Sequence, residues 1–319
     1  MIALWIILGA FVGWYIFTFV VVMIQTAYMY HMEKKCSRMQ EGLERKELLS
    51  KSGRLIVSKE HKFTFFPNDT GKRSPLIIIC PGGGYKYLCI EKEGWPTAMR
   101  LNQYGLSAFV LQYGTGKDCL DMSPMKELAE LIKHVSKNED RYNVDSKNYI
   151  LIGYSAGGNL AGMFGTKEEG YQKYGLQKPL AVFLGYFWTS DPEYYRHHYL
   201  NPWVWLLNYH LFRRGNEIMF KKRRFTEREK NALALHKKID RDYPKAYLFS
   251  GTQDIVVPHQ LQCGLVQKAI AKNHVDHIYH VFKNMPHGVG IGDFTTASGW
   301  LPEALSFAGV EIEKDDDRI

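Results

Sequence analysis

The stretch that most constrains the fold runs from Asn148 to Ala161, Asn-Tyr-Ile-Leu-Ile-Gly-Tyr-Ser-Ala-Gly-Gly-Asn-Leu-Ala. Its first half is apolar and rich in β-branched and aromatic residues, which predicts a strand. Its second half is rich in small residues, which let a helix approach a sheet closely. Ser155 lies between the halves, inside a G-x-S-x-G pattern. We predict a sharp turn that raises the Ser155 hydroxyl above the sheet as a nucleophile; a structural turn serine is the alternative.

A second glycine-rich turn follows another apolar run. Residues 76–80, Leu-Ile-Ile-Ile-Cys, are continuously apolar, which is typical of a strand buried on both faces of a parallel sheet. The run leads directly into residues 81–85, Pro-Gly-Gly-Gly-Tyr, called the glycine turn below. Glycines leave backbone N–H groups free to point toward a neighbouring serine, whereas a flexible surface loop is the alternative. We predict that Gly83 and Gly84 form an oxyanion hole together with Ala156.

Segments of strand length and helix length alternate along the rest of the chain. We predict helices over 95–104 and 124–138, strands over 107–113, 180–186, 245–250 and 277–282, and one or two edge strands within 54–66. This alternation implies a mostly parallel central sheet with helices on both faces. We expect one catalytic domain over residues 51–319. It contains an aromatic and basic insertion at about 190–240, which is a lid over the site, an interfacial surface or an ordinary helix pair.

Two polar residues follow predicted strands and complete a catalytic set. Asp254 comes just after the strand at 245–250, and His287 follows the last strand. An imidazole can take the proton of a serine hydroxyl, and a carboxylate fixes the imidazole tautomer and stabilises its charged form. We therefore predict Ser155 as nucleophile, His287 as base and Asp254 as the acid. The alternatives are Asp242, Asp276 and Asp293 for the acid and His280 for the base.

The N-terminal segment is unusually apolar. Residues 2–30 contain no Lys, Arg, Asp or Glu, and about 20 apolar residues suffice to cross a bilayer core. A cleaved signal peptide would carry a basic start and a shorter apolar region, and a buried core helix is the other alternative. We predict a transmembrane anchor over residues 1–31 that contacts the bilayer through residues 2–30, and a juxtamembrane helical stalk over 32–50. Basic residues follow the apolar run, so the positive-inside tendency places the catalytic domain in the cytoplasm.

The charge pattern and the cysteine content bear on nucleic-acid binding and on metal binding. The net charge is +8, and a cluster of eight basic residues lies within residues 213–230. We interpret this cluster as a solvated face or a contact with anionic lipid headgroups, and we expect no nucleic-acid partner. The five cysteines are odd in number and have no metal-ligand spacing, so we expect no bound metal and no cofactor. The oligomeric state is not predicted.

Taken together, the motifs resemble the α/β-hydrolase superfamily over residues 50–310. The glycine turn, residues 153–158 and residues 254–258, Asp-Ile-Val-Val-Pro, are similar to those of acetylesterases of the acetyl-xylan esterase-like and hormone-sensitive-lipase-like groups. Pro81 stands where the second group usually has histidine, which favours the acetylesterase branch. The resemblance implies an α/β-hydrolase fold. It also implies a triad of Ser155, Asp254 and His287 and oxyanion donors at Gly83, Gly84 and Ala156.

These observations lead to one functional prediction and several alternatives. We predict a membrane-anchored serine carboxylesterase that hydrolyses small-molecule or glycan acyl esters, with O-acetyl as the favoured group. The anchor departs from the usual pattern of polysaccharide esterases, which are secreted or soluble. The alternatives are a lipid or acylglycerol hydrolase acting at the bilayer and a non-catalytic hydrolase fold used for interaction. An acyltransferase or a peptidase also stays open, because the triad does not choose the acyl acceptor.

Overall fold

Each apolar run predicted as a strand becomes part of one central sheet. The computed structural model describes residues 2–50, 56–119, 122–189, 202–204, 206, 217–218, 221 and 226–313. Within these residues the sheet has eight strands in the order β1-β2-β4-β3-β5-β6-β7-β8. The strands are β1 (Ile56–Ser58), β2 (Phe63–Phe66), β3 (Ser74–Cys80), β4 (Ala108–Leu111), β5 (Val144–Tyr154), β6 (Ala181–Gly185), β7 (Lys245–Gly251) and β8 (His277–Phe282). β2 pairs antiparallel with β1 and β4, and the other neighbours pair parallel, as predicted.

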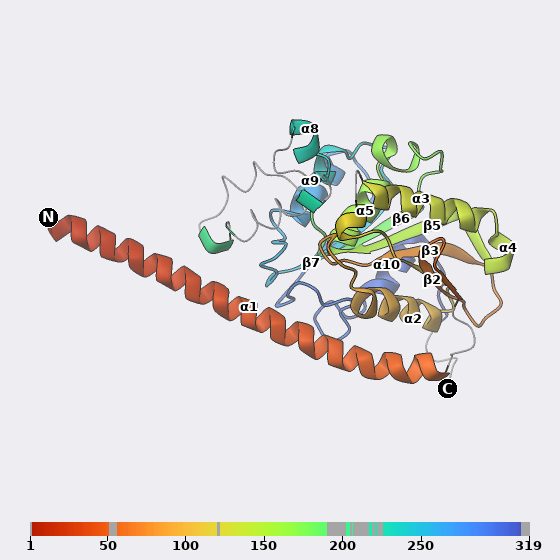
Figure 1. Ribbon diagram of the computed structural model, residues 1–319, viewed down its shortest axis with the longest axis horizontal. Helices are drawn as coiled ribbons and strands as arrows, with labels where there is room; N and C mark the ends of the chain where they lie inside the picture. Colours follow the sequence, from red (N-terminus) through yellow and green to blue (C-terminus); the bar gives the residue numbers. More distant parts are fainter. Residues whose placement is uncertain are drawn as a thin grey trace.

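Helices cover both faces of the sheet, which confirms the predicted fold class. α2 and α10 lie on one face, and α3, α5 and α9 lie on the other (Figure 1). The helices are α1 (Ile2–Ser50), α2 (Trp95–Gln103), α3 (Ser123–Ser136), α4 (Glu139–Tyr142), α5 (Ser155–Phe164), α8 (Glu227–Lys230), α9 (Cys263–Lys272) and α10 (Trp300–Ala308). Shorter helical segments are η1 (Ile90–Gly94), η2 (Gly116–Asp118), η3 (Lys167–Tyr171) and η4 (Leu235–Lys237). Each face has its own hydrophobic core, one including Leu128 and Leu160 and the other Ala98 and Leu305.

The strand β3 begins two residues before the apolar run that predicted it. Ser74 and Pro75 pair with Val144 and Asp145 of β5, and the register shifts between Pro75 and Ile77. Proline has no N–H to donate to a ladder, so within a sheet it is confined to strand starts, edges and irregular positions. The irregular pairing therefore lets a proline enter a central strand.

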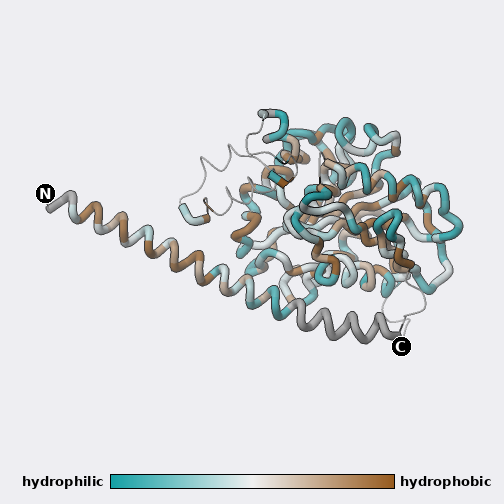
Figure 2. The backbone as a smooth tube through the Cα atoms, viewed as in Figure 1, coloured by the Kyte–Doolittle hydropathy of each residue, from teal (hydrophilic) through white to brown (hydrophobic). Residues whose placement is uncertain are grey.

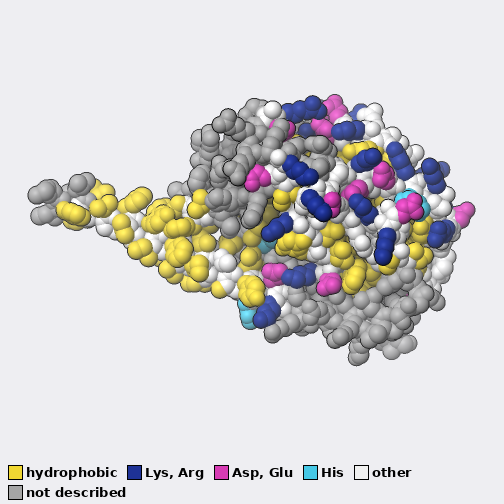
Figure 3. Space-filling model, viewed as in Figure 1, with side chains coloured by type: hydrophobic (Ala, Val, Ile, Leu, Met, Phe, Trp, Pro, Cys, Tyr) yellow, Lys and Arg dark blue, Asp and Glu magenta, His cyan; other side chains and the backbone are white. Residues whose placement is uncertain are grey.

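Helix α1 continues without a break through the predicted anchor and the predicted stalk. Within it, Trp5–Lys35 is long and apolar enough to cross a membrane, by length and composition, although a signal sequence can share these properties. The N-terminal part projects away from the sheet, and its backbone is coloured mostly hydrophobic in Figure 2. In Figure 3 hydrophobic side chains cover the described part of this projection, whereas the charged side chains lie over the rest of the molecule.

One side of α1 packs on the domain. Its half-buried or buried residues recur every three or four positions, as expected for one helical face: Thr18, Val21, Val22, Gln25, Met29, Met32 and Glu33. Gln25 donates to the side chain of Gln253 at 3.5 Å, and the Tyr28 hydroxyl donates to the Asn284 carbonyl at 3.2 Å. Gln253 follows β7 and Asn284 follows β8. The helix thus lies against the loops at the carboxyl ends of these strands.

Most of the predicted insertion at 190–240 lies outside the described residues, including Trp205, Tyr209 and Phe212. Trp203 is described, and it lies against α1. Its ring centroid is 4.7 Å from that of Tyr15 and 4.9 Å from that of Phe19, and its indole N–H donates to the Tyr15 carbonyl at 3.2 Å. The described part of the insertion therefore contacts the apolar segment of α1.

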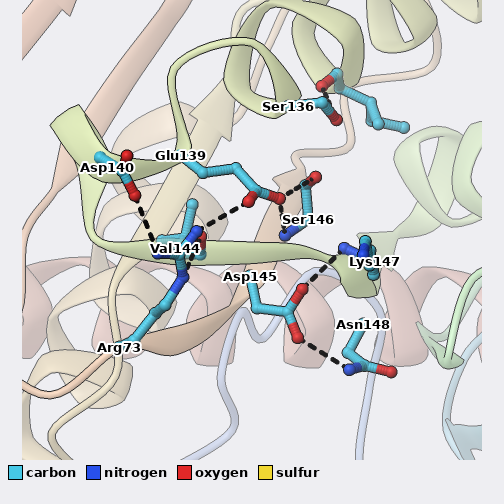
Figure 4. Close-up of polar contacts among 10 residues, drawn as sticks. Arg73, Ser136, Glu139, Asp140, Val144, Asp145, Ser146, Lys147 and Asn148 are labelled. Atoms are coloured by element: carbon cyan, nitrogen blue, oxygen red, sulfur yellow. Dashed lines mark hydrogen bonds and ion pairs between the residues drawn. The ribbon is translucent and has the colours of Figure 1, made fainter.

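A charged cluster fixes the end of β5 that is remote from the predicted nucleophile (Figure 4). Arg73 donates to Glu139 at 2.7 Å, to Asp140 at 2.9 Å and to the Val144 carbonyl at 3.0 Å. Glu139 also accepts the backbone N–H of Ser146 at 2.9 Å. Exposed ion pairs contribute little to stability, so the cluster acts mainly by holding the start of β5 against its neighbours.

The other end of β5 meets α5 at a distance that excludes side chains. A Cβ added to Gly157 would lie 2.0 Å from the Cys80 carbonyl oxygen and 2.4 Å from that of Pro81. A Cβ added to Gly153 would lie 2.4 Å from the Gly157 carbonyl oxygen. Backbone atoms cannot move aside as a flexible side chain can. The two glycines therefore allow the helix to start directly over β3 and β5.

We expect Gly157→Ala to lower the free energy of unfolding by about 3 kcal/mol, because α5 must move away from β3 to accommodate the methyl group. Thermal and denaturant unfolding of the purified protein measure the change. Gly264→Ala is the control, since a Cβ added there, in the first turn of α9, would come no closer than 3.0 Å to the atoms around it. Its effect should stay within about 1 kcal/mol. Equal stabilities of the two variants would contradict this account of the packing.

Candidate active site

Ser155 lies at the junction of β5 and α5 in a strained backbone conformation. Its φ is 49°, in the left-handed region that residues with a side chain rarely adopt. The preceding residue, Tyr154, is still extended, with φ −120° and ψ 138°. The Ser155 carbonyl accepts the N–H of Trp188 at 3.2 Å, which helps to hold the turn. The predicted strand–turn–helix is present, and it presents the serine at the carboxyl end of the central strand.

The structure brings Ser155, His287 and Asp254 together in a chain of hydrogen bonds. His287 Nε2 is 3.0 Å from Ser155 Oγ, and His287 Nδ1 is 2.7 Å from Asp254 Oδ2. The other carboxylate oxygen of Asp254 accepts the N–H groups of Val256 at 3.0 Å and Val257 at 2.7 Å. The Asp254 side chain is fully buried. A buried carboxylate with both oxygens satisfied can orient the imidazole and stabilise its charged form.

Opposing effects set the pKa of His287. Burial by itself lowers the pKa of the imidazole, because it disfavours the charged form. The negative charge of Asp254 and its hydrogen bond, together with the charge of Glu93, act in the opposite direction, and the net result is a raised pKa. Only the neutral imidazole can accept the serine proton. Activity that depends on this base is therefore lost as the pH falls through the raised pKa.

The alternative acids and base lie elsewhere. Asp276 lies just before β8, at the end of the sheet opposite to His287, and its carbonyl accepts the N–H of Ala246 at 3.1 Å. The others have partners of their own: Asp242 pairs with Lys167, Asp293 with Arg100 at 2.8 Å, and His280 with Glu303 at 3.1 Å. Of the candidates from the sequence, the structure thus brings together Ser155, His287 and Asp254.

The glycine turn lies beside Ser155, and Gly83 and Gly84 line the same cavity as Ser155. Gly83 and Gly84 have φ values of 124° and 62°, which favour glycine. A Cβ added to Gly83 would lie 2.1 Å from the Tyr87 carbonyl oxygen. Within the described part of the chain, the N–H groups of these two glycines donate to no protein acceptor. Together with the N–H of Ala156, at the start of α5, they are available to a negatively charged oxygen.

Polar contacts fix the glycine turn in place. The Tyr113 hydroxyl donates to the Pro81 carbonyl at 2.6 Å. The Tyr85 hydroxyl donates to Asn159 Oδ1 at 3.0 Å, and the Asn159 amide donates to the Leu233 carbonyl at 2.9 Å. All of these bonds are buried. Donors that are held before substrate binds need no rearrangement when charge develops on the substrate.

Glu93 is a further residue of the site that the sequence analysis missed. Its buried carboxylate accepts the N–H of Gly82 and the hydroxyl of Tyr186, the latter at 2.9 Å. The Tyr186 hydroxyl accepts the N–H of Gly290 at 3.0 Å. Burial raises the pKa of Glu93, against the opposing effect of the two hydrogen bonds. One carboxylate thereby joins the glycine turn to the loop that carries His287.

Ser155 and His287 open into a cavity of about 390 Å³. The predicted oxyanion donors line it as well, and much of the remaining wall is apolar. The other lining residues include Tyr87, Lys92, Trp188, Ile218, Val256 and two residues of α1, Met29 and Glu33. The contribution of α1 was not predicted. Among the residues that the structure describes, no group of three or more His, Cys, Asp or Glu side chains is arranged to hold a metal ion.

Sequence comparisons match this chain to one family model, to a xylanase and to an acetylxylan esterase. The model of the BD-FAE family matches residues 64–182. Endo-1,4-beta-xylanase B of Butyrivibrio fibrisolvens is 26% identical over 247 residues, covering 75% of this chain and 36% of that protein. An acetylxylan esterase of Xylanibacter ruminicola is 27% identical over 108 residues, covering 34% of this chain and 22% of that protein. The matches thus span little more than a third, or less, of the length of these relatives.

Solved structures with a similar fold are esterases and related hydrolases. An acetyl ester-xyloside bifunctional hydrolase from Caldicellulosiruptor lactoaceticus has a TM-score of 0.64 and 23% identity, covering 77% of this chain and 88% of that one. A carboxylesterase from Lactobacillus plantarum has a TM-score of 0.62 and 22% identity, and the match covers 80% of this chain and 95% of that one. The chain has the α/β-hydrolase fold, and the predicted resemblance to esterases with this fold is confirmed.

We expect Glu93→Gln to shift the acid limb of the pH profile of kcat/KM to lower pH, since it removes a negative charge that raises the pKa of His287. The loosened glycine turn should also lower kcat by about tenfold. Hydrolysis of p-nitrophenyl acetate across the pH range measures both effects. Glu91→Gln is the control, because Glu91 lies in the same segment and is exposed. An unchanged midpoint in Glu93→Gln would show that Glu93 has no electrostatic effect on His287.

Proposed function

We propose that this chain is a membrane-anchored serine carboxylesterase that hydrolyses short acyl esters, with acetyl as the favoured acyl group. The observation that carries the proposal is the hydrogen-bonded chain from Asp254 through His287 to Ser155, which ends in a cavity next to unused N–H groups. A non-catalytic role is disfavoured, because such a role does not require this geometry. The resemblance to known esterases supports the same class of reaction.

The proposed reaction proceeds through an acyl-enzyme. His287 Nε2 takes the proton of Ser155 Oγ while that oxygen attacks the ester carbonyl carbon. The glycine turn and the N–H of Ala156 donate to the resulting oxyanion. The C–O bond to the alcohol then breaks, and His287 gives its proton to the leaving oxygen. In the second half His287 takes a proton from water while the water oxygen attacks the acyl carbonyl carbon. The bond between that carbon and Ser155 Oγ then breaks, His287 returns its proton to Oγ, and the carboxylic acid leaves.

The preference for a short acyl group rests on the cavity and on the relatives. A volume of about 390 Å³ lies at the lower end of the range for small-molecule sites. Two of the similar proteins are named for acetyl esters, one as an acetylxylan esterase and one as an acetyl ester-xyloside hydrolase. A second candidate function, hydrolysis of esters lodged in a bilayer, is favoured by one observation. Met29 and Glu33 of the apolar helix α1 line the cavity.

The membrane part of the proposal rests on α1. Its apolar segment is mostly exposed in the structure, as expected for a helix whose partner is lipid. Basic residues follow this segment on its C-terminal side, so we propose that the domain faces the cytoplasm.

We expect Ser155→Ala to lower kcat for p-nitrophenyl acetate by about 10⁴-fold or more while the protein stays folded, because no other group can accept the acyl chain. A fluorophosphonate probe should label the wild type and should not label this variant. Ser298→Ala, at an exposed serine outside the cavity, is the control and should keep both activity and labelling. Labelling of Ser155→Ala at another serine would overturn the assignment of the nucleophile.

The proposed topology predicts the outcome of limited proteolysis. Protease added to intact cells that express the full chain should leave the domain uncut, and the same protease should digest it after permeabilisation. The physical reason is that the positive charges after the apolar run stay on the cytoplasmic side. Immunodetection of an epitope attached after Ile319 follows the cleavage. Digestion in intact cells, or a mature N-terminus beyond residue 20, would contradict the predicted anchor and its orientation.

A further inference from the structure

Helix α1 forms one wall of the cavity that contains Ser155. Met29 and Glu33 lie on the face of α1 that packs on the domain, and both line the cavity. The Glu33 carboxylate pairs with Lys92, which also lines the cavity. Burial alone would lower the pKa of Lys92, but the bond to Glu33 outweighs this effect and the pKa is raised. The helix and the catalytic domain therefore build the site together.

The two residues of α1 that line this cavity lie just beyond a membrane-spanning length of the helix. Trp5–Ile24 is a helix of about 30 Å, which equals the thickness of a bilayer core. Gln25, the next residue, already bonds to the domain. Met29 and Glu33 follow Ile24 by about 8 and 13 Å along the helix axis. The headgroup layer on each side is about 5–8 Å thick, so Met29 lies at its outer edge and Glu33 lies just beyond it.

Apolar side chains and one ion pair share the wall of the cavity. Met29, Tyr87 and Ile218 are among the apolar lining residues, and Tyr87 is 59% exposed, whereas Glu33 and Lys92 form the pair. Trp203 lies against Phe19. Phe19 precedes Ile24 by about 8 Å along the axis of α1, on the side of the proposed bilayer core. The described part of the insertion thus continues the apolar surface from the cavity toward the bilayer core.

We propose that the ester enters the cavity along α1 from the headgroup layer and that its alcohol moiety is a membrane-resident amphiphile. The apolar chains stay in the bilayer, and the short acyl ester reaches Ser155 past Met29. Hydrolysis adds water across the ester bond, releases the short acid to the aqueous side and leaves the amphiphilic alcohol in the membrane. This inference rests on the proposed esterase function and adds the class of the alcohol.

The test uses the full chain reconstituted in phosphatidylcholine vesicles. The probe is an acetylated dioleoylglycerol, whose transfer between vesicles is slow, and the released acetate is measured. We expect hydrolysis to be about 100-fold faster when probe and protein share a bilayer than when they are in separate vesicles, because the shared bilayer raises the effective concentration. Equal rates in the two arrangements, or no acetate release from the shared bilayer, would overturn the inference.

A pair of neighbouring variants tests the path itself. Met29→Lys places a charge in the apolar wall, and we expect it to lower the ratio of membrane-probe hydrolysis to p-nitrophenyl acetate hydrolysis by about tenfold. Tyr30→Lys places the same charge at the same depth on an exposed position of α1 and should keep the wild-type ratio. Equal ratios in the two variants would overturn the path along Met29.

The two proposals fail in different ways. If the wild type hydrolyses p-nitrophenyl acetate but leaves the membrane probe intact, the esterase function stands, and the proposal that the alcohol is a membrane-resident amphiphile is wrong. If the wild type hydrolyses neither ester, the proposed function is wrong and the inference falls with it. The shared-bilayer measurement needs only the wild type, so it decides the question even if Met29→Lys does not fold.

Discussion

The close approach of α5 to β3 and β5 is the constraint on which the rest of the site depends. Because Gly153 and Gly157 lack side chains, the first turn of the helix rests directly on the strand ends. Ser155 must then adopt a positive φ, which directs its hydroxyl away from the sheet. Parallel strands end at one common edge, so the loops after β7 and β8 deliver Asp254 and His287 to the same place. The order and direction of the strands thus determine where the three residues lie relative to one another.

This dependence explains how much was predictable. Strands β3, β4 and β6 are largely apolar runs, and the candidate triad lies where strands end, so both follow from local pattern and chain order. The catalytic roles of the triad stay predictions. Glu93 could not be found in this way. It lies in a segment that also contains the exposed Glu91, and its burial depends on Tyr186, which comes from a distant part of the chain. The sequence analysis also predicted no helix over the residues that form α9 and α10. The contact of Met29 with the cavity likewise depends on tertiary docking.

Two adjacent residues connect the long helix to the catalytic loops. Lys92 pairs with Glu33 of α1, and Glu93 accepts the N–H of Gly82 and contacts Tyr186. Both residues belong to the short segment η1. Helix α1, the proposed anchor, is therefore in direct contact with the segment that orients the glycine turn. Truncation before Glu33 would remove Met29 from the cavity wall as well as the proposed anchor, so the truncated chain would differ from the full chain in its access to substrate.

Helix α1 passes from its apolar segment to the cavity wall without a flexible joint. If it crosses a bilayer as proposed, the domain cannot swing freely on a tether, and the cavity keeps one orientation toward the lipid surface. Enzyme and amphiphile would then find each other by lateral diffusion in two dimensions. The surface density of the ester, measured per lipid, would set the turnover rate, and the volume of the surrounding compartment would not enter.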